Sequence, residues 1–477
     1  MLIAIVLIYF AILYTVSHFT GSNDDSNDSF FRGNRQSPWY MVAFGMIGAS
    51  VSGISFVSVP GMVLHSQMTY MQTCLGFIIG YFIVAFVLLP LYYRLNLTTI
   101  YSYLGTRFGS RTYSTGASFF IISKLTGAAL KFYVVCILLH DFVLKAYGIP
   151  FYVTVVAMVL LIWLYTRRGG IKTLVITDVI QTACMLVALV LITYNVLEAL
   201  NLTVPEAVSA IADNSLSRMF VFDDWISKQN FWKQFISGAF IVVVMTGLDQ
   251  DMMQKNLTCK SLREAQKDMC TYGFAFAPVN LLFLALGVLL TMLAAQQGIE
   301  MPASSDSLLP MFAATGSLGT SVVIIFTLGI VAASFSSADS ALTSLTTSFC
   351  VDILRRSSHT LTRRIVHIAM CAAFVLFILL FRYVNSTSLI DAIYIICSYT
   401  YGPLLGLFAF GLLTKRATCD KAAPYIAVAA PLLCYAIDRF TSSQFGYSFG
   451  YELLLLNGAL TFAGLYIFRS REAVDKA

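Results

Sequence analysis

Apolar stretches of roughly 20 residues, separated by short polar segments, recur along the whole chain. This is the length that an α-helix needs to cross the hydrocarbon core of a bilayer. Thirteen such stretches can be delimited, at residues 2–19, 38–64, 70–93, 115–143, 150–166, 174–197, 233–254, 272–296, 319–350, 364–383, 387–413, 423–440 and 451–468. The pattern predicts an all-α polytopic membrane protein with about thirteen transmembrane helices.

The composition agrees with this pattern and excludes a soluble globular protein. Of the 477 residues, 58% are hydrophobic and 11% are charged, whereas soluble proteins contain about 25% charged residues. The first stretch is not interpreted as a signal peptide, because it has neither a positively charged start nor a small-residue cleavage site. The ten cysteines show no paired spacing, so the sequence predicts neither a disulfide framework nor a metal centre.

The basic residues predict how the chain is oriented in the membrane. Of the 30 Lys and Arg, 22 follow odd-numbered stretches, among them Lys255 in the loop assigned after the seventh, and six follow even-numbered stretches or lie at their ends. Cytoplasmic loops carry the excess of Lys and Arg, so the N-terminus is predicted outside and the C-terminus inside. Because the net charge of +6 is spread over these loops, it indicates topology rather than affinity for nucleic acid.

A dense cluster of hydroxyls lies inside one apolar stretch, at Ala332–Ser348 (AASFSSADSALTSLTTS). Polar side chains in hydrocarbon are costly unless they face partners, water or a ligand. Four polar residues lie within about one helical turn, so several of their oxygens can converge: Ser336, Ser337, Asp339 and Ser340. Hard oxygen ligands suit a small hard cation such as Na⁺. The alternative is that Ser and Thr merely allow close helix packing.

Two apolar stretches look interrupted. The second contains four Gly, four Ser and a Pro at Gly45–Gly61, and the seventh has a Thr-Gly step followed by two acids within Val242–Lys255. Unwound segments free backbone carbonyls. The two stretches are five apart, and interruptions in corresponding positions of two halves indicate a transporter built from inverted repeats. Tight packing of Gly and Ser is the alternative.

Two lysines, Lys124 and Lys131, lie inside the fourth stretch, seven residues apart and therefore on one helix face. A cation in mid-membrane requires an anion. The candidates are an anionic solute or an acid within another predicted helix: Asp178, Asp249, Asp251 or Asp339. We favour a solute-facing role for Lys124, whereas an internal ion pair or snorkelling toward the surface is favoured for Lys131.

Six segments in order resemble the sodium:solute symporter family, which includes sodium-coupled sialic acid, proline, galactose and iodide transporters. The segments are Ser37–Gly61 (SPWYMVAFGMIGASVSGISFVSVPG), Thr98–Gly109 (TTIYSYLGTRFG), Gly169–Gln181 (GGIKTLVITDVIQ), Thr246–Lys255 (TGLDQDMMQK), Ala332–Ser344 (AASFSSADSALTS) and Tyr399–Leu413 (YTYGPLLGLFAFGLL). The resemblance covers nearly the whole chain and implies a LeuT-type fold of two inverted five-helix repeats.

The resemblance also implies a domain layout. Residues 1–477 form a single membrane transporter domain, in which 1–36 are an extra first helix and a polar linker, 37–413 the ten-helix core, and 414–477 two additional helices and a tail. The longest segment outside the membrane, about residues 198–231, is predicted to be external and to form a lid or short surface helices. The tail after Arg469 is predicted to be a solvated end.

The resemblance places two ion sites. The first sodium site comprises the carbonyls of the interrupted second helix and of Ala333, with two hydroxyls from the ninth helix: Gly48, Val51, Ala333, Ser336 and Ser337. Some relatives bind a second ion nearby, at positions that correspond here to Ser336 and to Ser52, Asp178, Asp339 and Ser340. Asp339 departs from the family pattern, which has a hydroxyl there. It would strengthen the ion site, link it to protons or pair with a lysine.

The solute site is expected at the two helix interruptions. Lys124 takes the place where the galactose transporter has an Asn ligand and the sialic acid transporter an Arg, which favours a carboxylate-bearing solute. Ser50, Asp249 and Gln250 would complete the pocket, although Asp249 would repel an anion unless it is paired or protonated. The absence of Lys in residues 271–296, and Ile395 at the approximate place of a sugar-binding Gln, argue against a galactose-like site.

These observations predict a secondary active transporter that carries a small anionic solute with Na⁺ by alternating access. The alternatives are a neutral sugar, polyol or amino acid as solute, or coupling to H⁺. A channel requires a continuous polar pore or a filter motif. An enzyme requires a nucleophile with its base, or a metal cluster. The sequence shows none of these features. We expect Na⁺ as the only metal, no cofactor, no obligatory protein partner, and a multi-pass location in a bilayer, expected to be a bacterial inner membrane.

Overall fold

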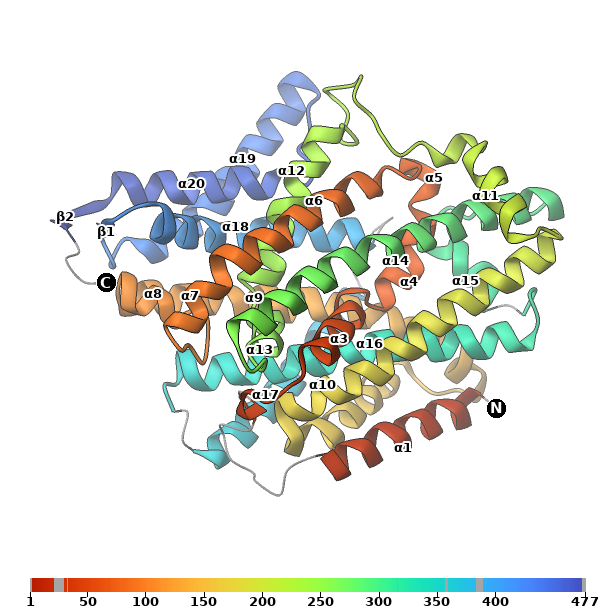
Figure 1. Ribbon diagram of the computed structural model, residues 1–477, viewed down its shortest axis with the longest axis horizontal. Helices are drawn as coiled ribbons and strands as arrows, with labels where there is room; N and C mark the ends of the chain where they lie inside the picture. Colours follow the sequence, from red (N-terminus) through yellow and green to blue (C-terminus); the bar gives the residue numbers. More distant parts are fainter. Residues whose placement is uncertain are drawn as a thin grey trace.

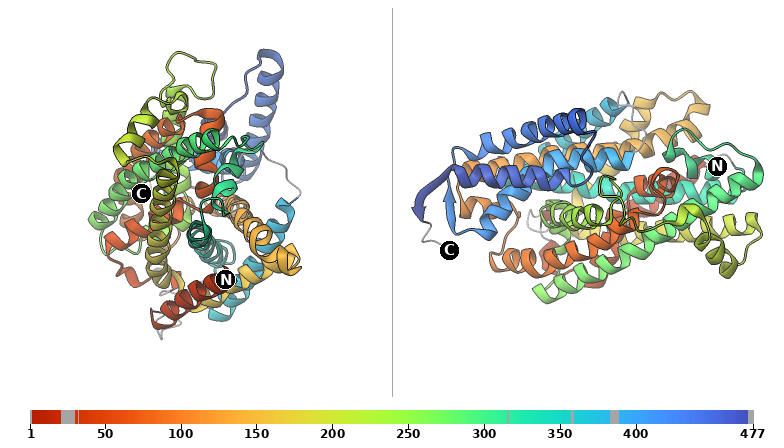
Figure 2. Two further views of the ribbon diagram at one scale, coloured as in Figure 1. Left: turned by 90° about the vertical axis from the view of Figure 1, so that its right-hand side faces the viewer. Right: turned by 90° about the horizontal axis from the view of Figure 1, so that it is seen from above.

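The computed structural model describes residues 2–20, 30–31, 33–314, 316–356, 359–382 and 389–473. Most helices run along one long axis of the molecule and pack against one another as a bundle (Figure 1). The start of α1 and strand β2 lie at opposite ends of this axis (Figures 1 and 2). The predicted linker at residues 21–34 lies largely outside the described residues.

The elements follow one another with short connections. The first part contains α1 (Leu2–Thr20), η1 (Gly33–Arg35), α3 (Trp39–Ser50), α4 (Gly53–Gly61), α5 (Val63–Ser66), α6 (Tyr70–Ile83), η2 (Val84–Leu88), α7 (Leu89–Arg94), α8 (Ser102–Arg107), α9 (Ser110–Leu139), η3 (His140–Leu144), η4 (Lys145–Tyr147), α10 (Phe151–Leu200), α11 (Val204–Ala212) and η5 (Ser215–Ser217). The second part contains α12 (Phe231–Val242), η6 (Val243–Gly247), α13 (Gln250–Asn256), α14 (Leu262–Gln297), η7 (Ser305–Ser307), α15 (Leu308–Ala313), α16 (Thr320–Ser348), η8 (Phe349–Ile353), α17 (Thr360–Phe381) and α18 (Leu389–Leu413). The chain then continues with β1 (Arg416–Thr418), α19 (Ala423–Phe445), α20 (Leu453–Ile467) and β2 (Arg469–Ala473).

Each predicted apolar stretch overlaps helical residues in the structure. By length and composition, seven helices within the described ranges can cross a membrane, or nine if each of two bent pairs forms one span. Three further apolar helices are shorter, at Ala4–Phe19, Phe151–Arg167 and Leu453–Ile467. The count of thirteen crossings and the orientation of the termini stay predictions.

The fifth and sixth predicted stretches join in α10 through a sharp break at Gly170. Its backbone has φ 52° and ψ −150°, a conformation that favours glycine. The backbone of Phe30 also approaches so closely that a Cβ on Gly170 would lie 2.5 Å from the Cα of Phe30. The predicted connection around residues 167–172 therefore exists as a tight bend between two helical arms.

The core is organised around α16, which lies inside the bundle beside α3 and α10 (Figure 1). Every residue of α16 from Gly329 to Ser348 is buried. The hydroxyl-rich segment predicted from the sequence thus faces protein rather than lipid, as polar groups at membrane depth require.

The chain end differs from the prediction of a solvated tail. Strand β2 pairs antiparallel with β1, with Arg416 opposite Ala473 and Thr418 opposite Arg469. The pairing satisfies backbone groups of two segments that flank α19 and α20. Since β1 and β2 are far apart in sequence and only a few residues long, no local sequence pattern predicts them.

Gly287 in α14 packs directly on the backbone of α4. A Cβ at this position would lie 2.1 Å from the carbonyl oxygen of Pro60 and 2.9 Å from its carbonyl carbon. We expect Gly287→Ala to lower the free energy of unfolding by about 1–3 kcal/mol through overpacking, measured as thermal unfolding of the purified protein. Gly127→Ala is the control, because no atom of the residues described lies within 4 Å of a Cβ there. Equal melting temperatures for the two variants would contradict this packing.

Candidate functional site

The interruption predicted in the second stretch is a break between α3 and α4, with a bend of 58°. The last four carbonyls of a helix have no partner within it. The carbonyl of Ile47 accepts a hydrogen bond from the N–H of Val51, and the carbonyl of Ala49 accepts one from the hydroxyl of Ser337. At the same break Ser52 is the N-cap of the next helix, α4. Gly48 permits close approach to α10, because a Cβ would lie 2.0 Å from the Oγ1 of Thr182.

The interruption predicted in the seventh stretch is also present, with a bend of 70° between α12–η6 and α13. Asp249 caps α13: its Oδ1 accepts from the N–H of Asp251 at 2.9 Å and of Met252 at 3.3 Å. A carboxylate is a favoured N-cap and complements the positive end of the helix. The sequence therefore places this acid at the break for a local structural reason.

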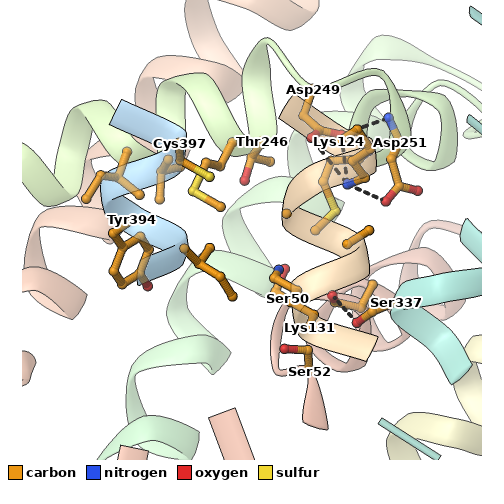
Figure 3. A pocket seen from close by; sticks show the side chains of 18 of the residues that line it. Ser50, Ser52, Lys124, Lys131, Thr246, Asp249, Asp251, Ser337, Tyr394 and Cys397 are labelled. Carbon is orange, nitrogen blue, oxygen red and sulfur yellow. Dashed lines mark hydrogen bonds and ion pairs between the residues drawn. The ribbon is translucent and has the colours of Figure 1, made fainter. Parts of the chain in front are cut away.

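A cavity of about 940 Å³, which includes space open to solvent, lies where the two breaks face α9, α14 and α18. Solute sites combine apolar walls with a few precisely placed polar groups. The walls here include Phe77, Ile241, Met245 and Phe276. Polar and charged groups project among them, including Ser50, Ser52, Lys124, Lys131, Thr246, Asp249, Asp251 and Tyr394 (Figure 3).

Lys124 lines this cavity, but its ammonium group is held by two acids. The Nζ atom lies 2.7 Å from Asp251 Oδ2 and 3.2 Å from both carboxylate oxygens of Asp249 (Figure 3). The hydroxyl of Tyr401 donates to Asp249 at 2.5 Å. This is the internal ion pair that the sequence left open as an alternative. Because Lys124 compensates its charge, Asp249 can line a solute cavity without leaving an unpaired negative charge there.

Lys131 lies two helical turns further along α9 and lines the same cavity. No acid within the described parts of the chain lies within ion-pair distance of its Nζ atom. The internal pair expected for Lys131 is therefore absent among the described residues, and its side chain lines the cavity instead of snorkelling outward.

Gln250 requires a second correction, because its side chain does not face the cavity. It is fully buried at the start of α13, where its Oε1 accepts from the N–H of Ile100 at 2.9 Å and its Nε2 donates to the carbonyl of Thr98 at 3.2 Å. The amide thus satisfies the backbone of the segment that precedes α8. Adjacent residues after an N-cap point in different directions, so Asp249 and Gln250 serve different neighbours.

Ser50 is at the break as predicted, and it opens a chain of hydroxyls that sequence reasoning missed. Its hydroxyl contacts that of Tyr272, and Tyr81 donates to Tyr272 at 2.7 Å. Tyr81 and Tyr272 both line the cavity. Tyrosine is common in apolar helices as packing material, so nothing local distinguishes these two from the other 23 tyrosines.

The residues predicted for the first sodium site lie on α16 and at the facing break of α3. The hydroxyl of Ser337 is 3.1 Å from the carbonyl of Ala49 and 3.3 Å from that of Ala333. Ser336 is fully buried and donates to Asp178 at 2.6 Å. Carbonyl and hydroxyl oxygens of two helices therefore meet at this point, which is the donor set that a hard monovalent cation requires. The coordination of Na⁺ by the five residues stays a prediction.

The residues predicted for a second ion are largely engaged with protein partners. Asp178 forms an ion pair of 2.8 Å with Lys255, which is 1% exposed. Asp339 accepts from the hydroxyls of Tyr165 at 2.6 Å and Ser340 at 3.2 Å. Ser52 lines the solute cavity at the break.

The position of Lys255 corrects the sequence analysis, which counted it among the loop residues. It belongs to the last turn of α13, which folds back into the protein after the 70° bend. A buried acid and a buried lysine compensate each other only when they are held together. The sequence shows both residues but gives no sign that they meet.

A sequence profile of the sodium:solute symporter family matches residues 30–423. The chain belongs to this family. It is a sodium-coupled symporter and a multi-pass protein of the cell membrane. The relatives are transporters, which argues against an enzyme.

Among curated relatives of this symporter, the sodium/sialic acid symporter SiaT of Proteus mirabilis is 25% identical over 459 residues, covering 89% of this chain and 87% of that protein. The sodium/sialic acid symporter NanT of Aliivibrio fischeri is 25% identical over 441 residues, covering 87% and 83%. The human sodium/iodide cotransporter is 25% identical over 245 residues, or 50% of this chain and 37% of that one.

Solved structures confirm the fold of this symporter. A substrate-bound, outward-open Na⁺-coupled sialic acid symporter superimposes with a TM-score of 0.83 at 21% identity, covering 98% of this chain and 97% of the other. The nucleobase-cation-symport transporter Mhp1 gives a TM-score of 0.58 at 14% identity, covering 93% and 94%. The predicted LeuT-type architecture is therefore correct.

Proposed function

We propose that this symporter carries a carboxylate-bearing solute together with Na⁺, and that Lys131 binds the solute's carboxylate. The observation that carries the proposal is the charge of the cavity wall. Lys124 is compensated by Asp249 and Asp251 at 2.7–3.2 Å, whereas Lys131 faces the cavity without an acid among the described residues. A cation kept at membrane depth without a protein partner indicates an anionic ligand.

Neighbouring groups support this assignment. The cavity also presents the hydroxyls of Ser50, Thr246 and Tyr394, which can hydrogen-bond further polar groups of a solute. The two bacterial relatives named above carry sialic acid, a carboxylated sugar. Both features suit a solute that has one carboxylate and several hydroxyls.

Coupling would follow from the predicted position of the first sodium site. Na⁺ between the α3–α4 break and α16 would fix the break, and the break also carries Ser50 and Ser52 on the solute side. Binding of Na⁺ would thereby order the solute site before the bundle rocks toward the inside. Each positive charge that moves inward gains about 2.3 kcal/mol per 100 mV of membrane potential.

A neutral solute is the second candidate, and the paired state of Lys124 is the observation that favours it. If Lys131 bound only water, the cavity would be close to neutral and its hydroxyls would suit a sugar or polyol. The two candidates predict different effects on uptake when the charge of Lys131 is removed.

The test is uptake into proteoliposomes of a labelled sialic acid, short carboxylates, proline, galactose and myo-inositol, with and without an inward Na⁺ gradient. We expect Na⁺-driven uptake of an anionic solute by the parent. In Lys131→Gln we expect uptake to fall at least about tenfold, because the solute's carboxylate would be buried without its cation at a cost of more than about 1.4 kcal/mol. Lys145→Gln, an exposed lysine beyond the end of α9, is the matched control. Na⁺-driven uptake of neutral solutes alone would overturn the anionic assignment.

The engaged state of Asp178 predicts the number of sodium ions. Lys255 already compensates this acid at 2.8 Å, so we propose that one Na⁺ is carried in each cycle. Uptake measured against Na⁺ concentration should then give a Hill coefficient close to one, because this coefficient cannot exceed the number of coupled sites. A coefficient that approaches two would show that the second ion site is occupied and would contradict the proposal.

A further inference from the structure

A second cavity, separate from the solute site, is lined by basic and aromatic side chains. Its volume is about 660 Å³, and it lies between the end of the first arm of α10, the start of α17 and Phe30. Arg167, Arg363 and Arg364 contribute three guanidinium groups. No acid is among the lining residues in the part of the chain that the structure describes. We refer to it as the basic cavity.

The walls of the basic cavity are firmly built. Arg363 is 2% exposed, and its guanidinium lies 4.6 Å from the ring centre of Phe30. His367 is 3% exposed and is fixed by hydroxyls on both ring nitrogens, from Thr346 at 2.9 Å and Thr166 at 3.2 Å. Rigid walls reduce the entropy lost when a ligand binds.

Arg167 supplies the observation that points to a ligand. Its guanidinium stacks at 5.1 Å on the ring of Trp163, one turn earlier in α10. Its Nε–H is buried and has no hydrogen-bond partner among the described residues. A buried donor without a partner costs about 1–3 kcal/mol, so it indicates an acceptor that the described residues do not provide.

The surroundings identify the source of this acceptor as lipid. Three side chains on one face of α17 are exposed at the border of the basic cavity: Leu361 (69%), Ile365 (59%) and Ile368 (53%). Ile368 also lines the cavity itself. An acyl chain can follow this apolar face while its headgroup enters between the arginines.

The side of the membrane fits this occupant. Arg167 and Arg364 lie at the ends of predicted stretches, on the side that the charge distribution predicts to be cytoplasmic. Anionic phospholipids are concentrated on that side, and basic pockets between helices bind their headgroups. We propose that the basic cavity binds the phosphate headgroup of an anionic phospholipid, with Arg167, Arg363 and Arg364 as its ligands. The proposal is independent of which solute the protein carries.

The test compares the purified full-length protein in detergent with added phosphatidylglycerol, phosphatidylcholine or inorganic phosphate. We expect phosphatidylglycerol to raise the melting temperature and to be retained in native mass spectrometry, whereas phosphatidylcholine does neither. Arg167→Gln should weaken the apparent affinity for phosphatidylglycerol by roughly fivefold, the effect of one basic side chain near an anionic headgroup. Lys260→Gln, an exposed basic residue predicted on the same side, is the control and should bind like the parent.

Three results would overturn the proposal. The first is equal retention of the anionic and the zwitterionic lipid. The second is unchanged affinity in Arg167→Gln and in Arg364→Gln, provided that both variants melt like the parent without lipid. The third is equal stabilisation by inorganic phosphate alone, which would assign the cavity to a soluble anion.

Discussion

Replacing Lys124 by alanine is expected to abolish Na⁺-driven uptake and to destabilise the protein by about 3–5 kcal/mol, the cost of removing one partner of a buried ion pair. The reason is the geometry of the two acids. Asp249 and Asp251 are 2% and 4% exposed, and both lie within 3.2 Å of the ammonium group. Without Lys124 the two carboxylates at the start of α13 would be buried close together without a cation. The measurement is the melting temperature in detergent together with uptake.

The chain offers a matched control on the same helix. Lys131→Ala removes an equal charge from the same cavity, but it leaves no acid of the described region without its partner. We expect this variant to melt close to the parent and to lose uptake of the anionic solute. A variant that combines Lys124→Ala with Asp249→Asn and Asp251→Asn should regain stability without regaining transport. If Lys124→Ala melts like the parent, the ion pair does not hold the break.

The transmembrane character of the chain could be predicted from the sequence because the bilayer imposes it. A backbone in hydrocarbon must satisfy its own hydrogen bonds, so apolar length and helix coincide. The two broken helices could be predicted for a related reason, since clustered Gly, Ser and acids inside an apolar run are costly unless they mark a site. The structure places a break at each of them, with bends of 58° and 70°.

Pairing between charges could not be predicted, because it depends on residues far apart in the chain. Lys124 and Asp249 are separated by 125 positions, and the sequence offered Asp178, Asp249, Asp251 and Asp339 as equal candidates. Lys255 was assigned to a loop because the hydropathy pattern does not show a bend. The 70° bend returns this end of the helix to the protein interior. Gln250 was assigned to the solute because it adjoins Asp249, whereas its amide serves Ile100 and Thr98.

The buried charges divide into two groups with different consequences. One group, Lys124 with Asp249 and Asp251, is internally compensated at the solute cavity. The other, Asp178 with Lys255, is compensated beside the predicted sodium site. Lys131 and Asp339 remain without an opposite charge in direct contact among the residues described. Asp339 is instead held by the hydroxyls of Tyr165 and Ser340, so Lys131 is the position at which a charged solute would change the electrostatic balance most.

Ser337→Ala is expected to raise the Na⁺ concentration for half-maximal uptake by at least about fivefold, which corresponds to roughly 1 kcal/mol for one lost oxygen partner. Ser337 is the residue whose hydroxyl spans the two halves of the predicted site, at 3.1 Å from the carbonyl of Ala49 and 3.3 Å from that of Ala333. The double variant with Ser336→Ala should lose Na⁺ dependence altogether, because both hydroxyls of α16 would then be missing from the predicted site.

Ser344→Ala is the control for this prediction. Ser344 is a buried serine two turns further along α16, and among the described residues its hydroxyl bonds only to the carbonyl of Ala341 in the same helix. Loss of that local bond should leave the Na⁺ dependence unchanged, since it contributes no oxygen to the break. If Ser344→Ala and Ser337→Ala shift the Na⁺ dependence equally, the hydroxyls of α16 act through helix packing. If only Ser337→Ala shifts it, the ion binds where α16 meets the broken helix, and the same contact that holds Na⁺ positions Ser50 and Ser52 for the solute.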